Sequence, residues 1–248
     1  MSAPRPSSTV MLIRDHNDQI EVLLVQRSKE LKTNAGAWVF PGGNVDEADY
    51  TSIANKENDD RTDEDHFFAA QHAAVREADE ETGISITLDH LTPFAHWTTP
   101  KVIPRRYATW FFLAHYNDDQ DVTVDGSEIV GYRWATPDRI LNLHRSGEIT
   151  MIPPTFVSLQ KILPFSSCQD AFAALEKTQP FHYNPRMAID KTADESNTPK
   201  GENIFTGKGF RTMLYEGDAG YETQNFHAEG SRHRLIMSGT EWCYESDF

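Results

Sequence analysis

Cysteine is scarce in this sequence: the 248 residues include two, Cys168 and Cys243, far apart in the chain. Neither belongs to a CxxC pair, the spacing typical of zinc ribbons and dithiol redox centres. The chain can therefore form one disulfide at most, and two reduced structural thiols are the simpler interpretation. A disulfide-stapled scaffold is excluded.

Long apolar runs are also lacking. No stretch approaches the roughly 20 apolar residues that a membrane-spanning helix requires. Residues 1–9 are polar and contain proline, unlike the apolar core of a signal peptide, and residues 245–248 match no targeting tail that we can interpret. We therefore expect no membrane partner and a cytoplasmic location.

Basic residues are outnumbered, with 23 Lys and Arg against 38 Asp and Glu and a formal net charge of −15. Non-specific nucleic-acid binders neutralise phosphates with a basic face, so we expect no nucleic-acid partner. An anionic small-molecule substrate would need a local positive patch or metal ions in this acidic protein.

Hydrophobic residues nevertheless make up 38% of the chain, enough for a substantial core. Residues 9–14 and 20–26 are β-branched or apolar runs around a turn-rich tetrapeptide, which predicts a β-hairpin. We expect further strands and proline-opened helices, in the order strands 84–88, 107–115 and 129–135, helices 137–143 and 154–163, and short strands 213–215 and 234–237. This order favours a mixed α/β fold in which helices cover a sheet.

The strongest helical pattern runs from about residue 64 to 82. Its apolar residues recur at helical spacing, and Gly83 is placed to end it. Residues 46–65 before it are acidic and polar without apolar periodicity. We interpret them as an inserted, solvated loop that interrupts the core.

Glu77, Glu80 and Glu81 stand at i, i+3 and i+4 of this helix, so their carboxylates converge on one face. Clustered carboxylates repel each other unless a hard divalent cation lies among them. Arg76 can pair with Glu77 or Glu80, or point at a phosphate. A solvated acidic helix end with an Arg76–Glu80 surface pair is the simpler alternative.

Arg76, Glu77, Ala78, Glu80, Glu81, Gly83 and Ile84 match the second half of the Nudix signature, G-x5-E-x7-R-E-U-x-E-E-x-G-U with U apolar. The chain thus resembles the Nudix hydrolase superfamily. Gly43 lies 33 residues before Arg76 instead of 14, so about 19 residues are inserted. Counting back eight from Arg76 reaches Phe68, which indicates that the first Glu is missing or supplied by the insertion.

A Nudix signature, or Nudix box, that is interrupted in this way resembles the acyl-coenzyme A diphosphatase branch of the family. Upstream, residues 23–43 are similar to the branch's coenzyme A signature, LLTxR-S-x3-R-x3-G-x3-FPGG, with Val25 in place of Thr and Lys32 in place of Arg. Segments near residues 94–114 and 152–155 also look like this branch. The resemblance covers about residues 8–165.

The resemblance implies a Nudix-type αβα sandwich with a mixed β-sheet. We expect residues 1–8 to be a flexible N-terminus and residues 9–165 to be the Nudix domain, with 46–65 inserted in the box. Residues 166–248 are expected to form a C-terminal extension packed on that domain.

The resemblance also implies a divalent cation, Mg²⁺ or Mn²⁺, held by Glu77, Glu80 and Glu81. The Gly43 carbonyl and Glu128 are further candidate ligands, although Glu128 can equally be an exposed turn acid. Glu77 is the candidate catalytic base, and Arg76 orients it. The candidate substrate contacts are Arg27, Lys32, Trp97, Arg105 and Arg106, each with surface solubility or core packing as the alternative.

The leading hypothesis is a metal-dependent hydrolase that cleaves the diphosphate of coenzyme A or acyl-coenzyme A to phosphopantetheine and adenosine bisphosphate. A Nudix diphosphatase for NADH, ADP-ribose or a nucleotide sugar is the second hypothesis. A non-catalytic nucleotide-binding Nudix module is the third. The expected partner is a small molecule with a diphosphate. Formation of a homodimer is left as an open alternative.

Overall fold

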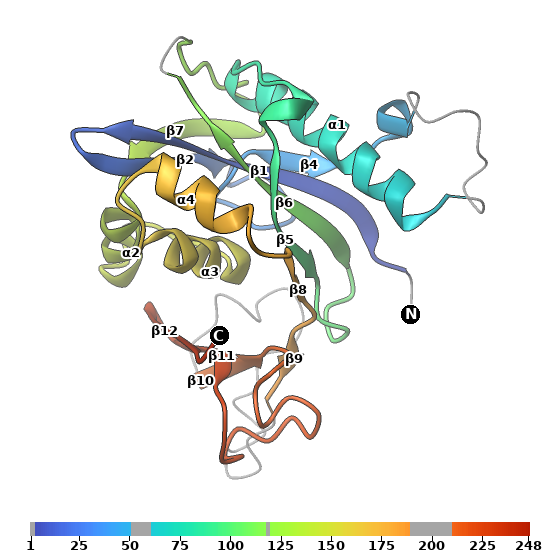
Figure 1. The fold of residues 1–248 in the computed structure, drawn as a ribbon, viewed down its shortest axis with the longest axis vertical. Helices are drawn as coiled ribbons and strands as arrows, with labels where there is room; N and C mark the ends of the chain where they lie inside the picture. Colours follow the sequence, from blue (N-terminus) through green and yellow to red (C-terminus); the bar gives the residue numbers. More distant parts are fainter. Residues whose placement is uncertain (1–2, 51–60, 118–119, 189–209) are drawn as a thin grey trace.

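The computed structural model describes residues 3–50, 61–117, 120–188 and 210–248 (Figure 1). Its main sheet has the strand order β3-β2-β1-β6-β5-β8, with β4 paired to β1 and β7 paired to β2. β1 and β6 are parallel, as are β5 and β8, and the other pairs are antiparallel. The strands are β1 Arg5–His16, β2 Gln19–Arg27, β3 Trp38–Val39, β4 Gly42–Asn44, β5 Thr92–Thr98, β6 Tyr107–His115, β7 Ile129–Ala135 and β8 Phe181–Tyr183.

The predicted hairpin is β1 and β2, which pair antiparallel up to His16 and Gln19. Asn17 and Asp18 form its turn, both with positive φ, as tight hairpin turns require. β1 begins at Arg5, where it pairs with Tyr107 of β6. The expectation of a flexible terminus is therefore wrong for residues 5–8, because backbone pairing with β6 fixes them.

Helices cover both faces of this sheet. Figure 1 shows α1 on one face and α2, α3 and α4 on the other. Side chains of the central strands alternate between the two layers: Val10 and Leu12 pack in the apolar cluster under α1, and Met11 and Ile13 pack in the opposite one. The helices are α1 Asp63–Thr82, α2 Pro137–Arg145, α3 Pro153–Ile162 and α4 Cys168–Leu175, with 3-10 turns η1 Glu47–Tyr50 and η3 Leu88–His90. The predicted αβα sandwich with a mixed sheet is confirmed.

The α1 helix follows from its sequence. Thr62 and Asp65 form a reciprocal capping box at its start, and Gly83 ends it with a left-handed φ of 69°. Alanines on the buried face let α1 approach the sheet closely. The expected strand at 84–88 is wrong, since Ile84 and Ile86 are buried in the α1 layer without strand pairing.

Strands that follow β8 form a second, smaller sheet. β9 Arg186–Met187, β10 Phe210–Leu214, β11 His233–Ser238 and β12 Glu241–Ser246 pair in the order β12-β11-β10-β9. Figure 1 shows this sheet at the end of the molecule, below α2 and α3. Met213, Tyr215 and Leu235 of this unit belong to the same apolar cluster as the main sheet's α2–α3 face. The C-terminal residues thus share a core with the main sheet.

Neither Cys168, which is buried, nor Cys243, which is exposed, is in a disulfide. Cys168 opens α4, and its backbone N–H donates to Asp15 Oδ1 at 2.8 Å. Among the helices of the described ranges, none is both long and apolar enough to cross a bilayer.

We expect the buried Asp218–Arg234 pair to hold the small sheet together. Both Asp218 oxygens accept from Arg234 at 2.7 Å, and both side chains are almost fully buried. Asp218→Asn leaves the Arg234 charge unpaired, so the free energy of unfolding should fall by about 3 kcal/mol or more in urea titrations. Glu222→Gln, which breaks an exposed pair with Arg186, is the control and should leave the midpoint nearly unchanged. An equal effect of both changes would contradict this assignment.

Candidate active site

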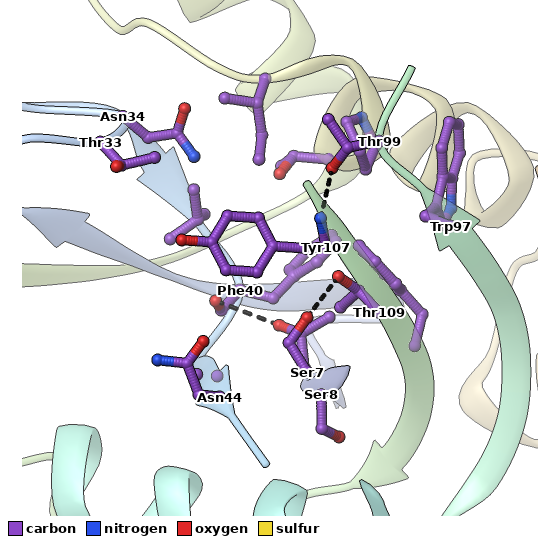
Figure 2. A pocket seen from close by; sticks show the side chains of 18 of the residues that line it. Ser7, Ser8, Thr33, Asn34, Phe40, Asn44, Trp97, Thr99, Tyr107 and Thr109 are labelled. Carbon is purple, nitrogen blue, oxygen red and sulfur yellow. Dashed lines mark hydrogen bonds between the residues drawn. The ribbon is translucent and has the colours of Figure 1, made fainter. Parts of the chain in front are cut away.

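The three predicted carboxylates line one cavity of about 640 Å³. Glu77, Glu80 and Glu81 reach it from α1, and Gly42 and Gly43 of β4 border it. Figure 2 shows other parts of its wall, with Ser7 and Ser8 from β1 near Thr109 of β6. The Ser7 and Thr109 hydroxyls lie 2.7 Å apart. The parallel pairing of β1 with β6 therefore brings the two strand starts to the same edge of the site.

Arg76 lies at the centre of a hydrogen-bond network. Its Nε and Nη2 donate to the two oxygens of Asp49 at 3.2 and 3.0 Å. Nη1 donates to Glu77 at 2.9 Å and Glu80 at 3.0 Å, and Nη2 also donates to the Asn44 carbonyl at 3.0 Å. A guanidinium has five N–H donors, and these contacts use all of them. Arg76 is therefore committed to orienting carboxylates, with no donor left for a phosphate.

These contacts also raise the pKa of Arg76 above its ordinary value, the Asp49 hydrogen bonds most of all. Arg76 thus stays charged at any physiological pH.

Asp49, within residues 46–65, fits the alternative that the insertion supplies the first carboxylate of the signature. It lies six residues after Gly43, where the signature has its first Glu, and its side chain is 4% exposed. Counting forward from Gly43 would have found it, whereas counting back from Arg76 crossed the insertion. The interpretation of 46–65 as one solvated loop is wrong at both ends, because η1 buries Asp49 and Tyr50 and α1 begins at Asp63.

Gly43 lies against the Glu77 carboxylate. A Cβ at this position would overlap the Glu77 carboxylate, so a larger residue here would have to displace that side chain. Burial raises the pKa of Glu77 above its ordinary value, against the opposing effect of Arg76. Glu77 is thus a half-buried carboxylate held between an arginine and a glycine backbone.

Glu81 is the most buried of the three carboxylates, at 7% exposure. The Gly42 N–H donates to its Oε2 at 2.9 Å. Burial raises the pKa of Glu81 to about 8, with the Gly42 hydrogen bond opposing and the charge of Glu77 adding to the rise. Glu80, in contrast, has a side chain that is 57% exposed. The exposure of the three carboxylates therefore increases from Glu81 through Glu77 to Glu80.

Two of the four predicted cationic contacts line the cavity. Arg27 Nε donates to the Thr33 carbonyl at 3.4 Å, and Arg105 Nη1 donates to the Thr33 hydroxyl at 2.9 Å. Lys32 is exposed and lies outside the lining. Arg106 also lies outside it, because its Nε donates to the Thr99 carbonyl at 3.1 Å.

Trp97 was a candidate substrate contact, with core packing as the alternative. It lies in β5 at 4% exposure and stacks on Tyr183 of β8, with ring centroids 3.8 Å apart and planes at 6°. The parallel pairing of β8 with β5 sets this contact. Trp97 lines the cavity, and Tyr183 covers one of its faces, so that face cannot stack a nucleobase.

Glu128 lines the cavity and is exposed. Its neighbour Asp125 also lines it and was missed in the sequence. Asp125 Oδ1 accepts from the Ser127 N–H and hydroxyl, both at 2.5 Å, and from the Glu128 N–H at 2.8 Å. Burial opposes ionisation of Asp125, but these hydrogen bonds outweigh it and lower its pKa. The sequence Asp-Gly-Ser at residues 125–127 is typical of a turn and could have indicated Asp125.

A protein-family model described as NUDIX domain matches residues 4–153 of the chain. Among curated proteins, human "Acyl-coenzyme A diphosphatase NUDT19" is 36% identical over 80 residues, 32% of this chain and 20% of that protein. The Xenopus laevis protein of the same name is 22% identical over 236 residues, 62% of each chain. The chain thus spans about three-fifths or less of the length of these relatives.

Among solved structures, the NUDIX hydrolase from Alicyclobacillus acidocaldarius is similar in fold, with a TM-score of 0.60 at 23% identity. The match covers 70% of this chain and 97% of that one.

Gly43→Ala tests the contact between β4 and Glu77. The added methyl must displace the Glu77 carboxylate, so we expect the hydrolysis rate to fall by on the order of a hundredfold, as when a positioning contact of a metal site is lost. The rate should be measured with the variant's melting temperature. Gly131→Ala is the matched control, because its Cβ meets nothing closer than 3.7 Å. Parent-like turnover by Gly43→Ala would contradict the contact.

Asp49→Asn tests the carboxylate that holds Arg76. The neutral amide leaves the Arg76 charge short of a partner, and we expect turnover to fall by about tenfold or more. Asp49→Glu should retain most of the rate. Glu47→Gln, which breaks an exposed pair with Arg61 on the same 3-10 turn, is the control. Equal rates for Asp49→Asn and the Glu47 control would show that Arg76 does not depend on Asp49.

The raised pKa of Glu81 has a consequence for stability. An unfolded glutamate titrates near 4.5, so in the cation-free protein the unfolded chain loses this proton first as pH rises. We expect the free energy of unfolding to fall between about pH 5 and about pH 8, and Glu81→Gln to flatten that fall. Urea titrations with a chelator measure it, with Glu64→Gln at the exposed start of α1 as the control. An unchanged slope in Glu81→Gln would refute the assignment.

Proposed function

The chain belongs to the NUDIX domain family, and we propose that it hydrolyses a diphosphate bond and that its substrate is coenzyme A or an acyl-coenzyme A. Cleavage yields phosphopantetheine and adenosine bisphosphate and requires a divalent cation. The observation that carries the proposal is the single cavity in which three carboxylates of α1 lie with Arg27 and Arg105. The relatives named acyl-coenzyme A diphosphatase and the resemblance of residues 23–43 to a coenzyme A signature support this substrate.

The donor set fits a hard divalent cation. Glu77, Glu80 and Glu81 present carboxylate oxygens at one end of the cavity, the ligands that Mg²⁺ and Mn²⁺ prefer. Two of them are buried enough to raise their pKa, a cost that a cation would offset. The Gly43 carbonyl and Glu128 are additional ligands in this proposal. A bound cation would neutralise diphosphate charge and make an attacking water more acidic.

The protein's own groups have separate tasks. Arg76 is a positioning residue, because its five donors hold Asp49, Asn44, Glu77 and Glu80. Glu77 accepts the proton of the attacking water, for which a carboxylate with raised pKa is suited. Arg27 and Arg105 bind phosphate oxygens, since they are cations on the cavity wall. A cytoplasmic location and a homodimer stay predictions.

The test is a turnover assay with Mg²⁺ on coenzyme A, acetyl-coenzyme A, NADH and ADP-ribose, with the products identified by mass. We expect phosphopantetheine and adenosine bisphosphate from coenzyme A, and loss of turnover with a chelator. Glu81→Gln should lower the rate by on the order of a thousandfold. Asp79→Asn, on the same helix but outside the cavity lining, is the matched control and should retain the rate.

Cleavage of NADH or ADP-ribose with coenzyme A left intact would refute the coenzyme A proposal. Full turnover in the presence of a chelator would refute the requirement for a divalent cation.

A further inference from the structure

The cavity has walls of two chemical kinds. Its charged lining comes from α1, from β4 and the residues after it, from the end of β2, and from Arg105, Asp125 and Glu128. A second part of the lining is aliphatic, and we call it the aliphatic wall: Ile103, Ile152, Pro153, Pro154, Pro185 and Met213. Asn44 and Trp97, which both line the cavity, lie well apart in Figure 2. A ligand that fills the cavity therefore needs a charged part and an apolar part.

The aliphatic wall suits an alkyl chain better than a nucleobase. The aromatic residues of the lining are Phe40, Trp97, Tyr107 and Phe111, and none of them belongs to the aliphatic wall. Trp97 has one face stacked on Tyr183, with centroids 3.8 Å apart. Phe111 and Tyr215 pack around the same indole with centroids 6.3 and 5.6 Å away. A purine gains most from an open aromatic face, whereas an alkyl chain gains from any apolar contact. The wall offers isoleucine, proline and methionine carbons.

Two members of the wall come from the C-terminal residues. Pro185 lies between β8 and β9, and Met213 lies in β10 at 1% exposure. Met213 is held by pairing of β10 with β9 on one side and β11 on the other. The ion pair between Asp218 and Arg234 fixes the start of β11 in the same small sheet. The small sheet thus presents Met213 to the cavity from a fixed backbone.

We propose that the aliphatic wall binds the acyl chain of the substrate and that Met213, Pro185 and Ile103 determine which chain lengths are accepted. This inference rests on the proposed function, because it assigns the arm beyond the diphosphate of an acyl-coenzyme A. Each methylene that moves from water to such a wall improves binding by about fourfold when fully buried. The C-terminal unit is then part of the specificity pocket.

The first arm of the test compares free coenzyme A with its acetyl, hexanoyl and octanoyl thioesters on the parent protein with Mg²⁺. We expect kcat/KM to rise from the acetyl to the octanoyl thioester by on the order of tenfold or more, mainly through KM. Equal kcat/KM for all four would overturn the inference while leaving the coenzyme A proposal intact. No cleavage of any of them would instead refute the proposed function.

The second arm uses two pairs of matched variants. Ile103→Asn makes the wall polar in a loop, and Val102→Asn changes the adjacent residue, which is 60% exposed and outside the lining. Met213→Gln keeps the side-chain length, and Met237→Gln makes the same change at a buried site of the same sheet that does not line the cavity. Circular dichroism and melting temperature establish that each variant is folded.

We expect Ile103→Asn and Met213→Gln to lower the octanoyl-to-acetyl ratio of kcat/KM by about tenfold, and the controls to keep the parent ratio. A ratio that is unchanged in Ile103→Asn would overturn the inference, even if Met213→Gln failed to fold. A ratio that falls equally in Val102→Asn would also overturn it, because the effect would then not come from the cavity.

Discussion

The Arg76 guanidinium joins three segments that are separate in sequence, and the geometry of the site depends on it. One edge of the guanidinium holds Asp49 of η1, one nitrogen reaches the Asn44 carbonyl at the end of β4, and another reaches Glu77 and Glu80 of its own helix. The acidic α1 face would repel itself without this charge. With it, two carboxylates stay in place, and Glu81 is held separately by the Gly42 N–H.

Arg76 and the carboxylates around it line a cavity that the sheet also borders. The starts of β1 and β6 meet in parallel, so Ser7 and Thr109 lie together close to β4. Trp97 of β5 pairs with Thr109 of β6, and β8 adds Tyr183 beside it from the C-terminal part of the chain. The charged part of the site is thus built from the segment that the family model matches, whereas the aliphatic wall also includes residues beyond position 153.

Local patterns predicted the local structure well. The β1–β2 hairpin, α1 with its Gly83 end, β6 and β7 all follow from spacing and turn residues within a few positions. The insertion was one expected source of the first carboxylate, but Asp49 was not named, because the insertion separates it from Arg76 along the chain while its spacing from Gly43 is kept. The strand that holds Trp97 was not predicted, because its pairing with β6 and β8 is a long-range effect. The contribution of Met213 to the cavity has no sequence signal, since it depends on how the small sheet packs.

The arrangement of charges around Arg76 makes one structural measurement decisive. Crystals of the protein grown with Mn²⁺ would locate the cation by anomalous diffraction. We expect the anomalous peak among the carboxylates of Glu77, Glu80 and Glu81, with Arg76 still bound to Asp49. A peak elsewhere on the chain, or an Arg76 side chain turned from Asp49 toward a bound diphosphate, would contradict the account.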